Sequence, residues 1–582
     1  MSLPCGCLSA RRLVATLVLP CGLWAQPAAP GPVLQLPTYT VTGERELPPP
    51  ERWLYARIPG FEVLSNASAA KTKDLLGEFQ RFTHALNLVW PGLVPPSAAP
   101  ASLILCGSGD KFGAFLPTAS GSERAMASIT LRSRDQAAIA LDLQTTVLDL
   151  PTSEGPAPVV VDADGNADGS NLNPGIAVDA YRQLNREYIR YLLTGRESPA
   201  PAWFAEGLAQ LFMAMDVTET TITLGKLADP NLRTEPMARG RAAPEEDRDF
   251  NAALATSVLI PMAEMLTVST DSTEAKNPLG RVWAKQCYAF VHWGLYGDDG
   301  AHQKDFFIFL ARLGSEPLSE SLFEACFKAD YREMLSTLRG YIQVTRHKVA
   351  GIKADKGQKI PEPPPVAVRE ATQAEVGRVV GDALLLAGHP AEARAVYVTA
   401  YRRGERDPAL LAALGLAELA AGDRPRAQSL LQAALTGRTL RPRAGLELAR
   451  LRLTDALAQP QADHGKLSAA QTSHAMEPLL AAPSQPTPPP ESFELMADIW
   501  AHSATPPSAT DLAAIEQGVR LFPRQTELVY RAAELRAHNG YPREAHGLVR
   551  LGLRLALDAP TRARFEKLLA ALPPEPPAPA KP

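Results

Sequence analysis

Cysteine is scarce in this 582-residue sequence and occurs in no metal-binding or redox pattern. Six cysteines are present, three of them near the N-terminus, and there is no Cys-x-x-Cys pair. This excludes the common cysteine zinc sites and dithiol redox centres. Cys106, Cys287 and Cys326 lie in apolar stretches, so we expect them to be buried structural thiols.

The sequence also lacks an excess of one charge and any apolar run long enough to span a bilayer. Lys and Arg number 59 against 63 Asp and Glu, which gives a net charge of −4. Binding to nucleic acid or anionic lipid is driven by excess positive charge, so we expect no nucleic-acid partner. The apolar run at 13–24 is shorter than the ~20 residues that a spanning helix needs.

That short run has the pattern of a secretory signal peptide. Arg11 and Arg12 precede it, and small residues follow it. We therefore predict that residues 1–25 are a signal peptide, that the protein is periplasmic or secreted, and that no transmembrane segment remains after removal of the signal. The alternative, a buried N-terminal helix, is disfavoured because Pro20 would break it.

Proline, in contrast, is abundant. The 53 prolines in 582 residues amount to about 9%, against a usual ~5%. They concentrate in segments that divide the chain: a leader at 26–55, a linker at 350–370 and a disordered tail at 573–582. Two folded units are predicted between them, at 56–349 and 371–572.

The first unit is predicted to have an α+β fold. Residues 71–89 carry apolar side chains at helical spacing, and we expect the chain to be helical again from Val178 to about Val349. Short apolar runs predict strands at 61–65, 102–106, 127–131 and 137–141. This order suggests a small mixed sheet with a helix on one face, followed by a helical subdomain.

The second unit contains an internal repeat with a period of 34 residues. Six small, Gly or Pro positions recur at that offset. They are Ala383, Ala387, Gly388, Ala393, Ala400 and Pro408, matched by Ala417, Ala421, Gly422, Ala427, Ala434 and Pro442. The pattern resembles tetratricopeptide repeats, which implies an all-α solenoid that binds a protein or peptide partner.

The segment Trp203-Phe204-Ala-Glu206-Gly207-Leu-Ala resembles the WF-x-EG-LA helix of peptidase-MA-like gluzincins. The resemblance extends over roughly residues 56–345. In that family this helix donates a third zinc ligand, and the preceding helix carries H-E-x-x-H. The resemblance implies that Glu206 takes the third-ligand position and Glu187 the general-base position.

Arginines stand where the family has its two histidines. Arg186 and Arg190 flank Glu187, and an arginine stays protonated and has no lone pair to give a metal. We therefore expect no zinc, a vestigial Glu187, and an Arg–Glu cluster with Glu206 that lines a groove beside Trp203. The alternative is that both arginines belong to an ordinary solvated helix face.

Two further sites follow from shorter patterns. The resemblance places Tyr288 on a helix over the cleft; the alternative is an ordinary core tyrosine. Asp164, Asn166 and Asp168 resemble the start of a calcium loop, but Gly175 stands where the bidentate Glu belongs. Weak calcium binding and a plain solvated turn both remain open there.

Together these patterns predict an exported metallopeptidase-like protein that has lost catalysis. We expect it to act as a peptide- or protein-binding scaffold, through its groove and its helical repeats. The alternative function is an active hydrolase with a nonstandard site that uses Glu187 and Glu206. The Arg186 and Arg190 substitutions favour the first interpretation.

Overall fold

The computed structural model describes most of the chain between Leu36 and Pro574. The described residues are 36–39, 47, 49–93, 101–117, 126–145, 147–148, 176–177, 179–195, 200–213, 215–224, 254, 257–276, 278, 281–314, 316–343, 350–354, 359–459, 466–481, 487–556 and 558–574.

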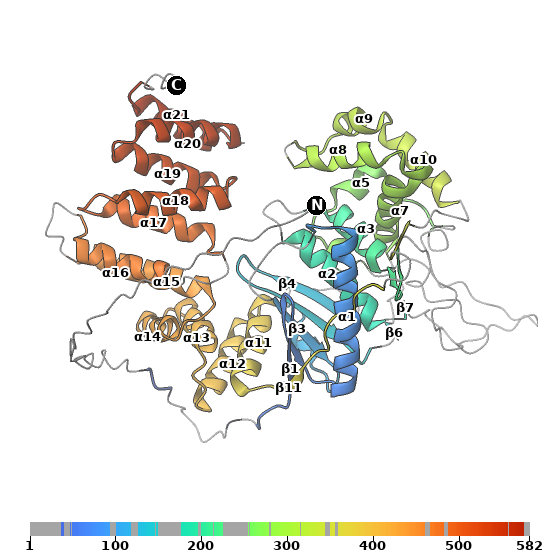
Figure 1. Ribbon diagram of the computed structural model, residues 1–582, viewed down its shortest axis with the longest axis horizontal. Helices are drawn as coiled ribbons and strands as arrows, with labels where there is room; N and C mark the ends of the chain where they lie inside the picture. The colour runs from blue at the N-terminus through green and yellow to red at the C-terminus, as the bar shows by residue number, and fades with distance from the viewer. Residues whose placement is uncertain are drawn as a thin grey trace, which may run out of the picture.

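A mixed six-stranded sheet, in the order β11-β1-β2-β3-β5-β4, forms the centre of the molecule (Figure 1). The strands β2, β3 and β5 run parallel, whereas β1, β11 and β4 are antiparallel to their neighbours. The four predicted strands correspond to β2 to β5, so the α+β prediction is confirmed. The strand bounds are β1 Leu54–Ile58, β2 Phe61–Ser65, β3 Ala101–Cys106, β4 Ser128–Arg132, β5 Ala137–Asp142 and β11 Val368–Glu370.

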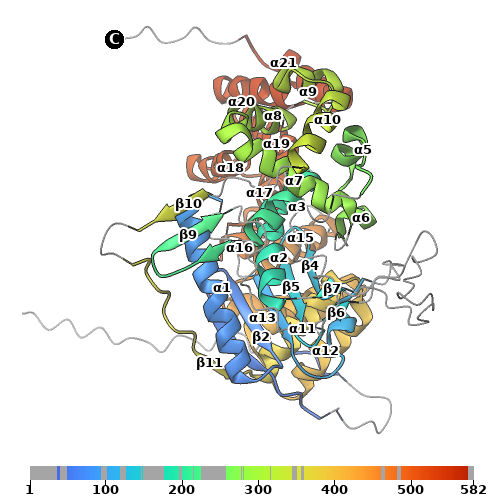
Figure 2. The ribbon, with the colours of Figure 1, turned by 90° about the vertical axis from the view of Figure 1, so that its right-hand side faces the viewer.

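One face of the sheet is covered by the helices α1 (Ala69–Val89) and α2 (Ala180–Thr194) (Figure 2). The α1 helix begins at Ser68, whose side chain accepts a hydrogen bond from the Lys71 backbone N–H. Its apolar stripe packs against α2, with the rings of Phe79 and Tyr188 5.2 Å apart. This packing holds α2 against the edge of the sheet.

A helical subdomain packs on the other side of α2. Its centre is the contact between α3 (Ala202–Met213) and α7 (Val282–Tyr296). Gly207 permits their close approach, because a Cβ there would lie 2.5 Å from the carbonyl oxygen of Cys287. The surrounding helices are α5 Met262–Thr267, α6 Thr273–Lys276, α8 Gln303–Leu313, α9 Glu320–Phe327 and α10 Tyr331–Ile342, with a short 3₁₀ turn, η3 Gly297–Gly300. A second 3₁₀ turn, η1 Phe112–Phe115, lies on the opposite face of the sheet.

The stretch from Val178 to about Val349, which was predicted to be helical, is helical only in part. Two short strands, β8 (Asp216–Val217) and β9 (Thr221–Leu224), interrupt it and pair with β10 (Ala350–Lys353). The predicted linker at 350–370 therefore contributes β10 to this sheet and β11 to the edge of the main sheet. A two-residue pair joins β6 (Val147–Leu148) to β7 (Ile176–Ala177).

The C-terminal region is an array of paired helices that stack into a column (Figure 1). Gly388 and Gly422 have φ values of +90° and +87° at the turns within successive pairs, as the 34-residue register requires. Ala393 and Ala427 are fully buried at helix contacts. The helix bounds are α11 Gln373–Leu386, α12 Pro390–Arg402, α13 Pro408–Ala420, α14 Arg424–Thr436, α15 Pro442–Ala458, α16 Ala469–Leu480, α17 Pro490–His502, α18 Ala509–Leu521, α19 Thr526–His538, α20 Pro542–Leu555 and α21 Ala559–Ala571.

The first repeat covers the second face of the sheet, so the two regions share a core. Ile104 and Ala140 from the sheet belong to the same buried cluster as Val379 from α11. Beside this cluster, Arg378 of α11 forms an ion pair of 2.8 Å with Glu62 of β2, and both side chains are 12% exposed. The repeats are therefore docked on the α+β region through a buried interface.

Candidate functional site

The two helices singled out by sequence meet at a buried ion pair. Arg186 on α2 and Glu206 on α3 are each 2% exposed, and Nη2 of Arg186 lies 2.5 Å from Oε1 of Glu206. Gln210, one turn further along α3, donates to the same oxygen at 3.0 Å. The alternative of a solvated helix face is therefore wrong for Arg186.

Glu187 faces the edge strand β4. Its carboxylate accepts hydrogen bonds from Ser128 Oγ at 3.2 Å and from Thr130 Oγ1 at 2.5 Å. Arg190 lies 3.4 Å from the same carboxylate and donates to the backbone carbonyl of Ala275 at 2.7 Å. The structure thus brings Arg186, Glu187, Arg190 and Glu206 into one buried region, in which Glu187 is held by the sheet.

The charges in this region keep Glu206 ionised. Burial raises the pKa of its carboxyl, but the positive charges of Arg186 and Arg190 outweigh this, so the pKa is held below its usual range. The second oxygen, Oε2, is buried and has no hydrogen-bond partner among the described residues. A buried carboxylate of this kind depends on its arginine partner.

The donor set does not fit a metal ion. A guanidinium group occupies the position beside Glu206, and it offers only N–H donors. Within the described residues, no group of three or more His, Cys, Asp or Glu side chains is placed to hold a metal. The calcium-loop candidates Asp164, Asn166 and Asp168 lie outside the described residues.

Trp203 and Tyr288 lie in the core of the helical subdomain. Trp203 is 1% exposed, and its ring centroid lies 5.3 Å from that of Phe290. Tyr288 is 4% exposed and packs edge-on against His292, whose Nδ1 is 2.7 Å from the Tyr341 hydroxyl. Both side chains therefore support the packing of α3 and α7; a binding role for Trp203 and a catalytic role for Tyr288 in the cleft remain predictions.

The three cysteines are free and buried, as the sequence indicates. Burial raises the pKa of Cys106 to about 12, with Asp142 contributing. Burial, and then the negative charge of Glu206, also raise the pKa of Cys287. Neither thiol is prepared for nucleophilic chemistry, because the thiolate is disfavoured in both.

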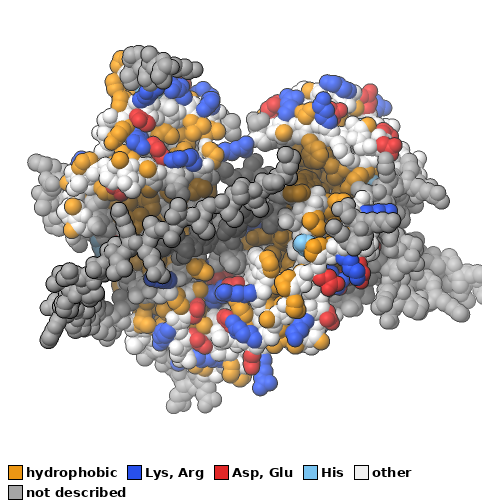
Figure 3. Space-filling model, in the orientation of Figure 1, with side chains coloured by type: hydrophobic (Ala, Val, Ile, Leu, Met, Phe, Trp, Pro, Cys, Tyr) orange, Lys and Arg blue, Asp and Glu red, His pale blue; other side chains and the backbone are white. Residues whose placement is uncertain are grey.

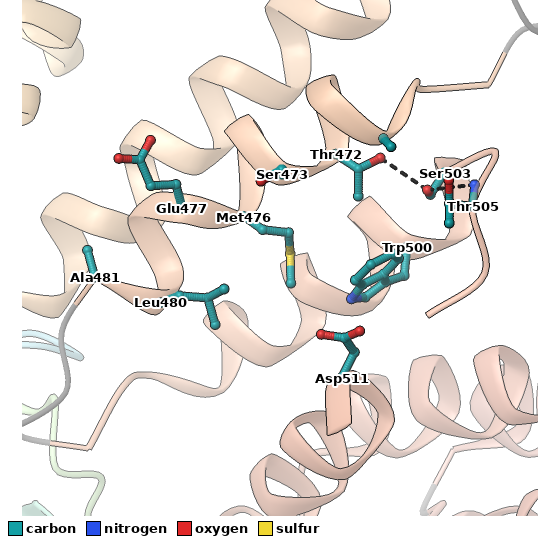
Figure 4. Close-up of a pocket in the computed structure, with 11 residues that line it drawn as sticks. Thr472, Ser473, Met476, Glu477, Leu480, Ala481, Trp500, Ser503, Thr505 and Asp511 are labelled. Carbon is teal, nitrogen blue, oxygen red and sulfur yellow. Dashed lines mark hydrogen bonds between the residues drawn. The ribbon is translucent and has the colours of Figure 1, made fainter. Parts of the chain in front are cut away.

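A pocket in the middle of the repeats was not indicated by any sequence motif. A cavity of about 500 Å³ lies among α16, α17 and α18 (Figure 4). Met476, Leu480 and Trp500 provide its apolar wall, and Asp511 lies on its opposite side. The signal that could have indicated it is the loss of repeat register in the Pro- and Ala-rich stretch at 459–491.

Among the described residues, the surface of the array carries no patch of one charge on the face shown in Figure 3, where basic and acidic side chains are interspersed. Among the helices of the described residues, none has both the length and the apolar character that crossing a membrane requires.

Comparisons with known proteins give likenesses to solved structures only. No protein-family model matches the sequence, and no curated protein matches it. The PilF structure from Pseudomonas aeruginosa is 17% identical, covers 34% of this chain and 84% of its own, and has a TM-score of 0.27. MamA from Desulfovibrio magneticus RS-1 is 17% identical, covers 32% of this chain and 96% of its own, and has a TM-score of 0.25.

A third structure, a thermophilic TPR protein from Thermus thermophilus, is 17% identical, covers 34% of this chain and 99% of its own, and has a TM-score of 0.25. The tetratricopeptide-like character of the array rests on its own paired helices and 34-residue register. The resemblance of Trp203 to Phe212 to the gluzincin helix remains a prediction.

Proposed function

We propose that this protein is a protein-binding scaffold, in which an α+β region with a metal-free Arg–Glu cluster carries a helical repeat array. The array supports the binding role, because it is a long stack of helix pairs that leaves large apolar side chains exposed. On the array these are Leu440, Leu457, Leu480 and Leu521, with exposures from 39% to 59%. Leu480 also lines the pocket among α16, α17 and α18, and a concave apolar site of this kind is typical of a binding surface.

The buried Arg186–Glu206 pair is the observation that carries the loss of catalysis in this proposal. A gluzincin site needs a metal bound to neutral histidines, whereas here a guanidinium group neutralises the glutamate directly. Under this proposal the α2–α3 pair keeps its spacing through an ion pair in place of a metal. The signal peptide proposed at 1–25 would deliver the scaffold to the periplasm or outside the cell.

The metal-free state has a direct test. Purified protein is expected to contain well under one zinc per chain and to show no peptidase activity that a chelator abolishes. Elemental analysis together with a peptide-cleavage assay checks both statements. Stoichiometric zinc with chelator-reversible cleavage would contradict the loss of catalysis and favour the alternative hydrolase with Glu187 and Glu206.

The binding role is tested by site-specific cross-linking in cell-envelope extract. A photo-cross-linking amino acid is placed at Leu480, which is 59% exposed and lines the pocket, and in a second protein at Phe307. Phe307 is the matched control because it is an apolar side chain, 42% exposed, on α8 of the α+β region. A discrete cross-linked product is expected from position 480 alone; equal products from both positions, or none, would exclude the pocket beside Leu480 as the binding surface.

A further inference from the structure

A short part of the leader lies against the repeats as a bound peptide would. Residues 36–39 belong to neither a helix nor a strand. Leu36 and Tyr39 pack against the core that the sheet shares with the first repeats. The carbonyl oxygen of Pro37 accepts a hydrogen bond of 2.9 Å from the hydroxyl of Tyr401 on α12. The segment is thus held by side chains and by its own backbone.

Tyr39 makes the most specific contacts. Its hydroxyl donates to Oε1 of Glu418 at 2.9 Å, and its ring lies edge-on to Tyr401 with centroids 5.3 Å apart. The guanidinium of Arg426 lies 5.1 Å from the ring centroid, within cation–π distance. Burial, and then the charge of Glu418, raise the pKa of Tyr39, so its phenol keeps the proton that it donates.

The repeat fold itself does not require a carboxylate at position 418. In the 34-residue register, Glu418 of the second repeat corresponds to Leu384 of the first. Leu384 is 7% exposed and Glu418 is 1% exposed, so an apolar side chain fills the same place in the neighbouring repeat. Arg394 neutralises Glu418 from α12 and donates from Nη2 to Oε2 at 3.1 Å, so Oε1 is able to accept from a phenol.

We propose that α12, α13 and α14 form a peptide site selective for tyrosine, and that residues 36–39 occupy it as a tethered ligand. An external segment of the same chemistry, extended and carrying a tyrosine, must displace this internal ligand in order to bind. The proposal rests on the binding role of the repeats and specifies how one of their surfaces is regulated.

The tether sets the strength of this competition. Tyr39 lies only a short stretch of chain before β1, which starts at Leu54. A connection of so few residues gives an effective concentration of roughly millimolar. For a peptide with a dissociation constant near 0.1 mM, the internal ligand therefore weakens apparent binding by about tenfold.

The test measures binding of a fluorescent peptide with the sequence of residues 34–42 to the full chain by anisotropy. The Tyr39→Ala chain is expected to bind the peptide at least about tenfold more tightly than the wild-type chain, because its internal ligand is lost. Thr38→Ala is the matched control: Thr38 is exposed, and this chain is expected to bind at the wild-type level. Melting curves check that each chain is folded.

Selectivity is tested with a second peptide in which phenylalanine replaces the tyrosine. It is expected to bind the Tyr39→Ala chain more weakly, and the Tyr39→Ala, Glu418→Leu chain is expected to bind both peptides alike. Equal affinity of the wild-type and Tyr39→Ala chains, no binding to either, or equal binding of both peptides to Tyr39→Ala would overturn the proposal. Failure of the cross-linking at position 480 would instead contradict binding at the pocket among α16, α17 and α18, while leaving the site on α12, α13 and α14 intact.

Discussion

At the scale of single residues, the Arg186–Glu206 pair shows how much of the site could be predicted from sequence. The motif around Trp203 indicated that α2 and α3 meet near these side chains, and the structure brings them together. Sequence could not say which arginine pairs with Glu206, because that depends on the rotation of α2. It also could not show that Glu187 faces β4, since Ser128 and Thr130 are distant in sequence.

Removal of Arg186 is expected to leave the buried carboxylate of Glu206 without its ion-pair partner. Arg186→Ala should lower the free energy of unfolding by about 3–5 kcal/mol, the usual cost of breaking a buried pair from one side. Adding Glu206→Gln should recover much of that loss. Urea denaturation measures both effects. Arg424→Ala is the control, because its pair with Asp455 is exposed at 45% and 47% and should be worth about 0–1 kcal/mol.

The same pair predicts a pH dependence. The folded-state pKa of Glu206 is lowered, so its ionised form stabilises the fold above the unfolded pKa of about 4.3. This contribution is lost as the pH falls through the lower, folded-state pKa. The cost of Glu206→Gln should therefore be largest near neutral pH and shrink on acidification below about pH 4. Denaturation at several pH values checks this; a constant cost would show that Glu206 is not ionised in the fold.

At the scale of elements, the predicted parts were those with a strong local pattern. The strands β3 and β5 have nearly continuous apolar runs, β2 and β4 have apolar residues mixed with polar ones, and the repeats carry Gly and small residues in register. The short strands β8, β9, β10 and β11 were missed. β8 has only two residues, β9 and β10 pair with each other across more than 100 residues of chain, and β11 pairs with the distant β1. Gly207 is an opposite case, in which the residue was noticed in the sequence motif but its role was not. Its role is explained only by the close contact between α3 and α7.

Gly207→Ala is expected to destabilise the protein by roughly 1–3 kcal/mol, because its Cβ would press on the Cys287 carbonyl. Gly77→Ala on α1 is the matched control. Nothing lies within 4 Å of a Cβ at Gly77, so alanine there should be neutral or stabilising by up to about 1 kcal/mol through helix propensity. Thermal melting compares the two variants; equal changes in Tm would show that the spacing between α3 and α7 can adjust to the added methyl group.

At the scale of the whole molecule, the cores do not follow the division into two regions expected from proline content. The sheet lies between two clusters, one with α1 and α2 and the other with the first repeats. A third cluster, which includes Phe493, Leu528 and Phe565, belongs to the later repeats alone. The unit of cooperative folding is therefore expected to end inside the array rather than at the linker 350–370.

Calorimetry is expected to resolve two transitions. Val379 lies in α11 against the sheet, so Val379→Ala should lower the midpoint temperature of the transition of the sheet and first repeats. Phe565→Ala, in α21, should lower only the other transition. Both side chains are fully buried, so each substitution should lower the free energy of unfolding by about 1–5 kcal/mol. A single transition that shifts with both variants would show that the array and the α+β region unfold together.

The pairing of β1 with β11 has a consequence for the order of events during synthesis. Leu54 of β1 pairs with Glu370 of β11. The sheet therefore lacks its last strand, β11, until more than half of the chain has been synthesised. At about 5–20 residues per second, that interval is roughly 15–60 s. During it, the apolar face that α11 later covers is open to other nascent chains. We therefore expect the unfinished sheet to be prone to pairing with other chains until β11 and α11 are in place.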